Sequence, residues 1–193
     1  MVNALSSVLH FILQTVFGFV TITLLARFFM QWARVSFRNP IGQFVIAVTD
    51  WIVLPVRRVI PSLLGLDIAT LLLAWGVQIV FALIEKFRIA KYVDISMMTL
   101  LLLSLIGLAH MAVYFVTGIV LIAVILSWVG PQNPAAFIFS ELARPFLAPF
   151  RRLIKPIGGL DISPLVLFVV LQIIQLLLFN LRQSLLPSFI PGL

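Results

Sequence analysis

Two aspartates, Asp67 and Asp161, occupy the same short sequence, Gly-Leu-Asp-Ile, in the two halves of the chain. Each opens a long apolar run. A carboxylate in that position can cap a helix, because it accepts free backbone N–H groups and meets the positive end of the helix dipole. We expect both aspartates to be helix caps, bridged to an arginine pair. The alternative is a symmetric site for a cation or a proton at the mouth of a membrane segment.

Two glutamines, Gln78 and Gln172, lie eleven residues beyond these aspartates. Eleven steps along an α-helix return to within ~20° of the starting direction and advance ~16 Å, so each amide shares a face with its aspartate near the middle of a bilayer. Polar groups in hydrocarbon need partners, which favours interhelical hydrogen bonds. The other polar residues on these predicted faces are Gln14, Thr21, His110, Tyr114, Thr117 and Gln175. The alternative is a cavity between the two halves that passes ions or protons, with His110 as a titrating group.

Two arginine pairs, Arg57-Arg58 and Arg151-Arg152, stand ten residues before the aspartates. Arginine side chains next to an apolar surface are suited to anionic lipid head groups. We therefore expect all four to contact lipid, or alternatively to form a docking surface for a protein partner.

The segments that carry the arginine pairs, about 40–60 and 134–153, place apolar residues on one side of a helix and polar residues on the other. Each begins with Asn-Pro, which suits a helix start. Pro55 and Pro149 are expected to kink or end these helices. Basic amphipathic helices of this kind lie in the plane of the lipid head groups.

Other chemical signatures are absent from the sequence. The chain has no cysteine, no phosphate-binding glycine loop, no His-Glu-x-x-His motif and no nucleophile elbow. Its two histidines, His10 and His110, lie on different apolar runs and are weak evidence for haem ligation. We expect no catalytic residue, no metal site and no bound cofactor, and hence no enzyme.

The composition is that of a membrane protein. Of the 193 residues, 63% are hydrophobic and 10% are charged, against about 45–50% and about 25% in soluble domains. The mean hydropathy is +1.23, which excludes a soluble fold and a disordered chain. The net charge of +7 comes from residues placed between apolar runs. These cations favour anionic lipid rather than nucleic acid.

Four apolar runs are long enough to cross a bilayer, at about 8–30, 67–84, 96–129 and 162–181. The first run lacks a basic leader and a cleavage site, so we expect a retained span. The third run exceeds one upright span, and we expect one long, tilted or protruding helix. The first and third connections carry most of the Lys and Arg residues, which places them in the cytoplasm and both termini outside.

The chain is an internal duplication of two units, 1–94 and 95–193. The sequence PVRRVIPSLLGLDI at Pro55–Ile68 recurs as PFRRLIKPIGGLDI at Pro149–Ile162, 94 residues later. Upstream the offset becomes 96, which pairs Trp32 with Trp128. Each unit contains two spans around one basic segment, so the units should be parallel, related by an axis along the membrane normal. The predicted fold is an all-α membrane protein with four spans and two interfacial helices.

These doubled motifs resemble the YggT (YlmG) family of bacterial and plastid membrane proteins, which carry two YGGT repeats with a P-x-R-R-x-I…G-x-D signature. The resemblance covers nearly the whole chain and implies a small integral protein of the bacterial plasma (inner) membrane. Family members are linked to osmotic-stress tolerance and ion balance, to division and nucleoid organisation, and in plastids to haem attachment. The resemblance supplies no catalytic residues.

Two functions follow from these observations. The first is a non-enzymatic scaffold, assembly or membrane-organising factor, whose arginine pairs recruit a membrane protein or organise lipid. The second is a component of ion or osmolyte transport, carried by the aligned Asp and Gln side chains. Four helices rarely enclose a pore, so the second function requires at least a homodimer.

Overall fold

The computed structural model describes residues 2–60, 66–89, 95–130, 132–154 and 161–185. Within these ranges the regular structure is helical, with six helices and no strand. The helices are α1 (Val2–Trp32), α2 (Pro40–Arg57), α3 (Ile68–Ile89), α4 (Met97–Val129), α5 (Pro134–Leu153) and α6 (Ser163–Leu185). The long apolar run of the second unit forms one continuous helix, α4, of 33 residues. At 1.5 Å per residue it is ~50 Å long, more than a ~30 Å hydrocarbon core requires.

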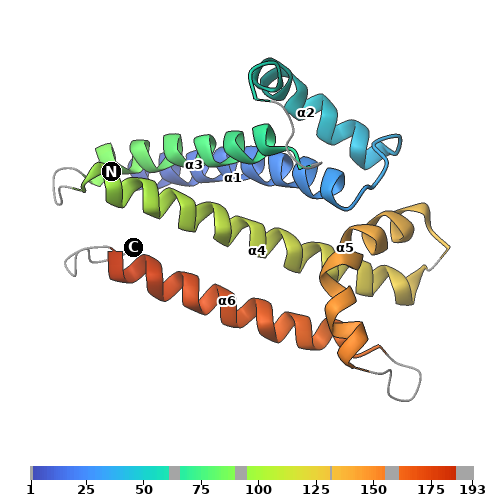
Figure 1. The fold of residues 1–193 in the computed structure, drawn as a ribbon. Coiled ribbons are helices and arrows are strands. Elements are labelled where there is room, and N and C mark those ends of the chain that lie inside the picture. The colour runs from blue at the N-terminus through green and yellow to red at the C-terminus, as the bar shows by residue number, and fades with distance from the viewer. Residues whose placement is uncertain (1, 61–65, 90–94, 131, 155–160, 186–193) are drawn as a thin grey trace.

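The four longest helices form an open bundle (Figure 1). Helices α1 and α4 run in one direction, and α3 and α6 run in the opposite direction. Helix α3 packs on both α1 and α4, whereas α6 packs mainly on α4 and α5. Helices α2 and α5 lie at the end of the bundle where α1 and α4 finish.

Helix length and composition allow one more membrane span than the sequence predicts. By these two criteria five of the described helices could cross a membrane, namely α1, α2, α3, α4 and α6. The sequence predicts four. Helix α2 accounts for the difference, because its 18 residues include few charges although it also carries a polar side.

The shorter helices begin as the Asn-Pro motifs predict. The Asn39 side chain accepts a hydrogen bond from the Gly42 N–H (2.8 Å), and that of Asn133 accepts one from the Ala135 N–H (2.9 Å). A proline occupies the first turn of each helix. Gly42 is required for close approach, since a Cβ there would lie 2.6 Å from the Phe37 Cα.

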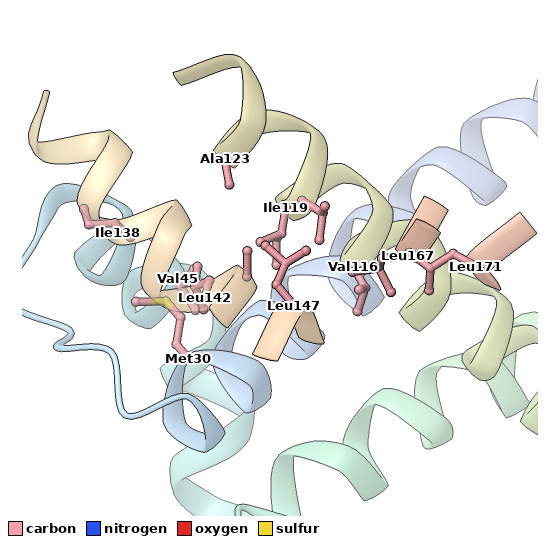
Figure 2. Packing of buried hydrophobic residues seen from close by; sticks show 12 residues of the cluster. Met30, Val45, Val116, Ile119, Ala123, Ile138, Leu142, Leu147, Leu167 and Leu171 are labelled. Atoms are coloured by element: carbon pink, nitrogen blue, oxygen red, sulfur yellow. The ribbon is translucent and has the colours of Figure 1, made fainter. Parts of the chain in front are cut away.

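Both units contribute to a shared core. Met30 of α1 and Val45 of α2 pack against residues of α4, α5 and α6, including Ile119, Leu142 and Leu167 (Figure 2). Lipid tails are as apolar as these side chains, so close packing rather than exclusion of water holds such helices together. The two units are therefore packed as one body.

Candidate functional site

The predicted cap Asp67 lies immediately before α3 and is the centre of a buried junction. Its carboxylate accepts hydrogen bonds from the Arg57 guanidinium (Nε to Oδ1, 3.3 Å) and from the Thr70 backbone N–H (3.3 Å) and hydroxyl. The Arg57 Nη2 also donates to the Gln31 Oε1 (2.9 Å). One ion pair thus ties the end of α1, the end of α2 and the start of α3.

Electrostatics at this junction favour the ionised carboxylate. The Asp67 side chain is 1% exposed, and this burial alone would raise its pKa. The hydrogen bonds from Arg57 and Thr70, together with the charge of Arg57, outweigh burial and lower the pKa of Asp67 below its ordinary value. The charge is compensated, as a structural ion pair requires.

The second unit repeats the junction at the surface. The Arg151 Nε donates to the Asp161 Oδ2 (2.8 Å), and the Ser163 N–H donates to Oδ1 (2.9 Å). Burial alone would raise the pKa of Asp161, but the hydrogen bonds from Ser163 and Arg151 and the Arg151 charge lower it. The side chains of Arg151 and Asp161 are 50% and 35% exposed. The same sequence motif therefore builds one ion pair with a buried carboxylate, in which Arg57 is 35% exposed, and one ion pair in which both side chains are at least one-third exposed.

The four predicted lipid-contacting arginines fall into two classes. Arg57 and Arg151 are engaged by the aspartates. Arg58 and Arg152 are exposed, and neither forms an ion pair within the described part of the chain. The exposed member of each pair is the one available to a lipid or a partner.

A buried arginine that the sequence marks only as the end of an apolar run forms a second network. The Arg27 Nη1 donates to the Thr49 Oγ1 and to the Asp50 Oδ1, each at 2.7 Å. Its side chain is 5% exposed and that of Asp50 is 35% exposed. The sequence feature that could have identified this network is that Arg27 is a single cation inside α1 and is followed by more apolar residues. The second unit has Ala123 at the position equivalent to Arg27.

The two intramembrane amides of the first unit, Gln78 and Gln14, lie in different surroundings. The Gln78 Nε2 donates to the Thr21 Oγ1 (3.1 Å), and a Cβ at Gly107 would lie 3.0 Å from the Gln78 Oε1. Gln78 thus links α3 to α1 and fits against α4. Gln14, in contrast, is exposed on α1 and makes no hydrogen bond to another described residue.

The amides of the second unit are placed differently. Gln172 is exposed on the outer face of α6. The Gln175 Nε2 donates to the backbone carbonyl of His110 (3.4 Å), and its Oε1 is buried without a partner among the described residues. The His110 ring packs on Tyr114 at 5.2 Å. The structure therefore does not bring Gln78 and Gln172 together.

A further polar contact, which the sequence did not predict, links α1 and α3 at the other end of the bundle. The His10 Nδ1 lies 2.8 Å from the Glu85 Oε1. Across the described ranges, no group of three or more His, Cys, Asp or Glu side chains could hold a metal ion.

Several long apolar helices, with compensated charges between them, define a multi-pass α-helical membrane protein. The CCB3/YggT family model matches the chain twice, at residues 6–88 and 102–182, and the chain belongs to this family. The two matches correspond to the duplicated units.

The relatives include two bacterial proteins of similar length. The chain is 36% identical to the "Uncharacterized protein YggT" of Escherichia coli K12 over 188 residues, which cover 96% of each chain. It is 36% identical to the "Uncharacterized protein PA0392" of Pseudomonas aeruginosa over 172 residues, covering 88% of this chain and 87% of that one.

A third relative is shorter. The "Uncharacterized protein ycf19" of Guillardia theta is 36% identical over 89 residues, which cover 45% of this chain and 93% of the relative. That relative is about one unit long. No solved structure matches the chain.

Proposed function

We propose that the chain is a non-enzymatic scaffold or membrane-organising protein with four spans, which presents a basic surface to anionic lipid on the cytoplasmic side of the bacterial inner membrane. The observation that carries the proposal is the division of each arginine pair. One arginine is neutralised by an aspartate, and the next, Arg58 or Arg152, is exposed beside an exposed apolar residue, Val59 or Leu153.

The path of α2 supports four spans rather than five. Seven residues separate the end of α1 from the start of α2. Its last residue, Arg57, is hydrogen-bonded to Gln31 in the last turn of α1 and to Asp67 before α3. Both ends of α2 therefore lie near the same end of the bundle, so α2 returns the chain to the side where it began. Helix α5 starts soon after α4 ends, and the bond between Arg151 and Asp161 ties the other end of α5 to the start of α6, which supports the same path for α5.

The shared end of the two junctions supports the orientation. Both arginine pairs lie where α3 and α6 begin, on one side of the bundle. Short connections rich in arginine stay in the cytoplasm. These observations support the proposal that both termini lie outside and that the two units are parallel.

Accessibility labelling tests this topology in a chain without native cysteine. We expect Ser36→Cys, Val59→Cys and Leu153→Cys all to resist a membrane-impermeant maleimide in spheroplasts and to react after lysis. If α2 crosses the membrane, the first two positions will react from opposite sides. If Val59→Cys and Leu153→Cys differ, the parallel arrangement is wrong.

Retention of anionic lipid tests the basic surface. Arginines near a charged membrane surface contribute about 1 kcal/mol each. The double variant Arg58→Gln, Arg152→Gln should therefore retain about thirtyfold less phosphatidylglycerol when purified chains are titrated with lipid. Arg182→Gln, near the opposite end of α6, is the matched control and should retain lipid normally. Unchanged retention in the double variant, with a changed set of cross-linked proteins, would favour a protein partner.

A transport component is the second candidate function. It is favoured by Gln175, whose Oε1 is buried without a partner among the described residues beside the backbone of His110. An amide of this kind suits a polar path between helices. Proteoliposomes of the folded protein that pass no ions or osmolytes above empty vesicles would exclude this function.

A further inference from the structure

The two units contact each other through α3 and α4, and the equivalent surfaces on α6 and α1 have no such contact within the described part of the chain. Helix α3 packs on α1 of its own unit and on α4 of the next unit. On the α4 side, the Trp75 Nε1 donates to the Ser104 Oγ (3.0 Å), and Gln78 fits against Gly107. By the duplication, α6 corresponds to α3, and α1 corresponds to α4. The outer face of α6 and the outer face of α1 therefore correspond to the two surfaces of the α3–α4 contact, but they do not pack on each other within the described residues of one chain.

The α6 half of this contact is uncovered. Val169 and Gln172 correspond to Trp75 and Gln78. Val169 is 55% exposed, and Gln172 is exposed without a hydrogen bond to another described residue. They lie in a shallow groove of about 540 Å³ that is lined by Leu165, Phe168, Val169, Gln172, Ile173 and Leu176.

The α1 half is uncovered as well. Val8 and Phe11 correspond to Ser104 and Gly107, and they are 55% and 69% exposed. Gln14 follows Phe11 by one helical turn on the same exposed surface. The two faces are complementary in kind, because each is apolar and carries one amide without a partner inside the described chain.

We propose that neighbouring copies of this chain associate head to tail in the membrane, with the outer face of α6 of one copy packed on the outer face of α1 of the next. In this arrangement Gln172 hydrogen-bonds Gln14 of the neighbouring copy, and Phe11 of that copy fills the groove. The pairing repeats the antiparallel contact of α3 with α4. It holds whether or not the basic surface binds lipid, and so goes beyond the proposed function.

The geometry fits a closed assembly. Parallel units keep both edges at one depth in the bilayer, so each copy can contact two neighbours, and head-to-tail contacts that close form rings. The relative that is about one unit long supports association between copies. A single unit contains no second unit to cover its second span, which a further copy would cover instead.

Disulfide cross-linking tests the interface in full-length chains that lack native cysteine. Two differently tagged chains, one with Val8→Cys and one with Leu176→Cys, which lie at the same level when Gln172 of one copy meets Phe11 of the next, are co-expressed and oxidised in native membranes. We expect a disulfide-linked dimer that carries both tags. The matched control replaces Val8→Cys with Ile125→Cys, at an exposed position of α4, and should give no such dimer. Equal cross-linking in the control, or no cross-linking in either mixture, would overturn the proposal.

A second variant tests the proposed hydrogen bond between Gln172 and Gln14 of the neighbouring copy. Interhelical hydrogen bonds of this kind change association about threefold to twentyfold, and Gln172→Leu should weaken self-association in lipid by that factor. Gln183→Leu, an exposed glutamine near the end of the same helix, should have no effect. If the protein is monomeric and binds lipid normally, the interface is wrong and the proposed function is retained. If it is dimeric and binds no lipid, the proposed function is wrong and the interface is retained.

Discussion

Replacing Arg57 by alanine is expected to destabilise the folded protein by about 3–5 kcal/mol, because a buried carboxylate loses its compensating charge. Asp67 is 1% exposed and would keep only the hydrogen bonds of Thr70. The same change also removes the bond to Gln31 that joins α2 to α1. The free energy of unfolding can be measured in mild detergent by tryptophan fluorescence, since the chain contains four tryptophans.

The duplicate junction supplies the matched control. Arg151→Ala removes an equivalent bond to Asp161, but both side chains there are at least one-third exposed. Exposed ion pairs contribute about 0–1 kcal/mol, so this variant should unfold almost as the unaltered protein does. Equal losses at the two junctions would show that burial does not set the strength of the ion pair.

The pH dependence of the Arg57→Ala variant has a definite sign. In the unaltered protein the pKa of Asp67 is lowered, so its stabilising contribution is present above the unfolded value of about 3.9 and is lost as the pH falls through the folded pKa. Without Arg57, burial is opposed only by the hydrogen bonds of Thr70, so the pKa of Asp67 should be higher in the variant than in the unaltered protein. The stability deficit of the variant should therefore shrink on acidification, as the pH falls through the higher folded pKa of Asp67 in the variant and the carboxyl group becomes neutral.

The architecture was largely predictable because its signals are local. Apolar length, the Asn-Pro starts and the duplicated motifs define the helices before any tertiary contact is known. The count of spans was harder to predict, since α2 is apolar enough to qualify as one. What argues against a span is a tertiary contact, the bond of Arg57 to Gln31 and Asp67, which helical periodicity does not encode.

The site residues show where the duplicated sequence loses its predictive value. Gln78 and Gln172 occupy equivalent positions, yet Gln78 bonds Thr21 and Gln172 is exposed. Local sequence is shared by the two units, whereas neighbours are not: α4 covers α3, and α6 lacks an equivalent cover. The spacing of arginine and aspartate predicted both ion pairs, but their different burial depends on what packs around each.

Replacing Asp50 by alanine is expected to cost about 3 kcal/mol or more, because Arg27 would then be a buried cation that retains only the hydroxyl of Thr49 as a partner. The matched control is Glu141→Ala, which removes the half-buried partner of the exposed Arg144 on the same helix and should cost less than about 0.5 kcal/mol, because Arg144 can be solvated without it.

A second substitution separates charge compensation from packing. Buried ion pairs can often be replaced by apolar residues with little loss, whereas breaking one is costly. Arg27→Met in the Asp50→Ala background removes the orphaned cation and keeps an unbranched side chain in the same space. The double variant should therefore recover most of the free energy of unfolding that Asp50→Ala loses. If it is no more stable than the single variant, Arg27 contributes through the shape of its side chain and its bond to Thr49, and the charge of Asp50 is not what holds α1 to α2.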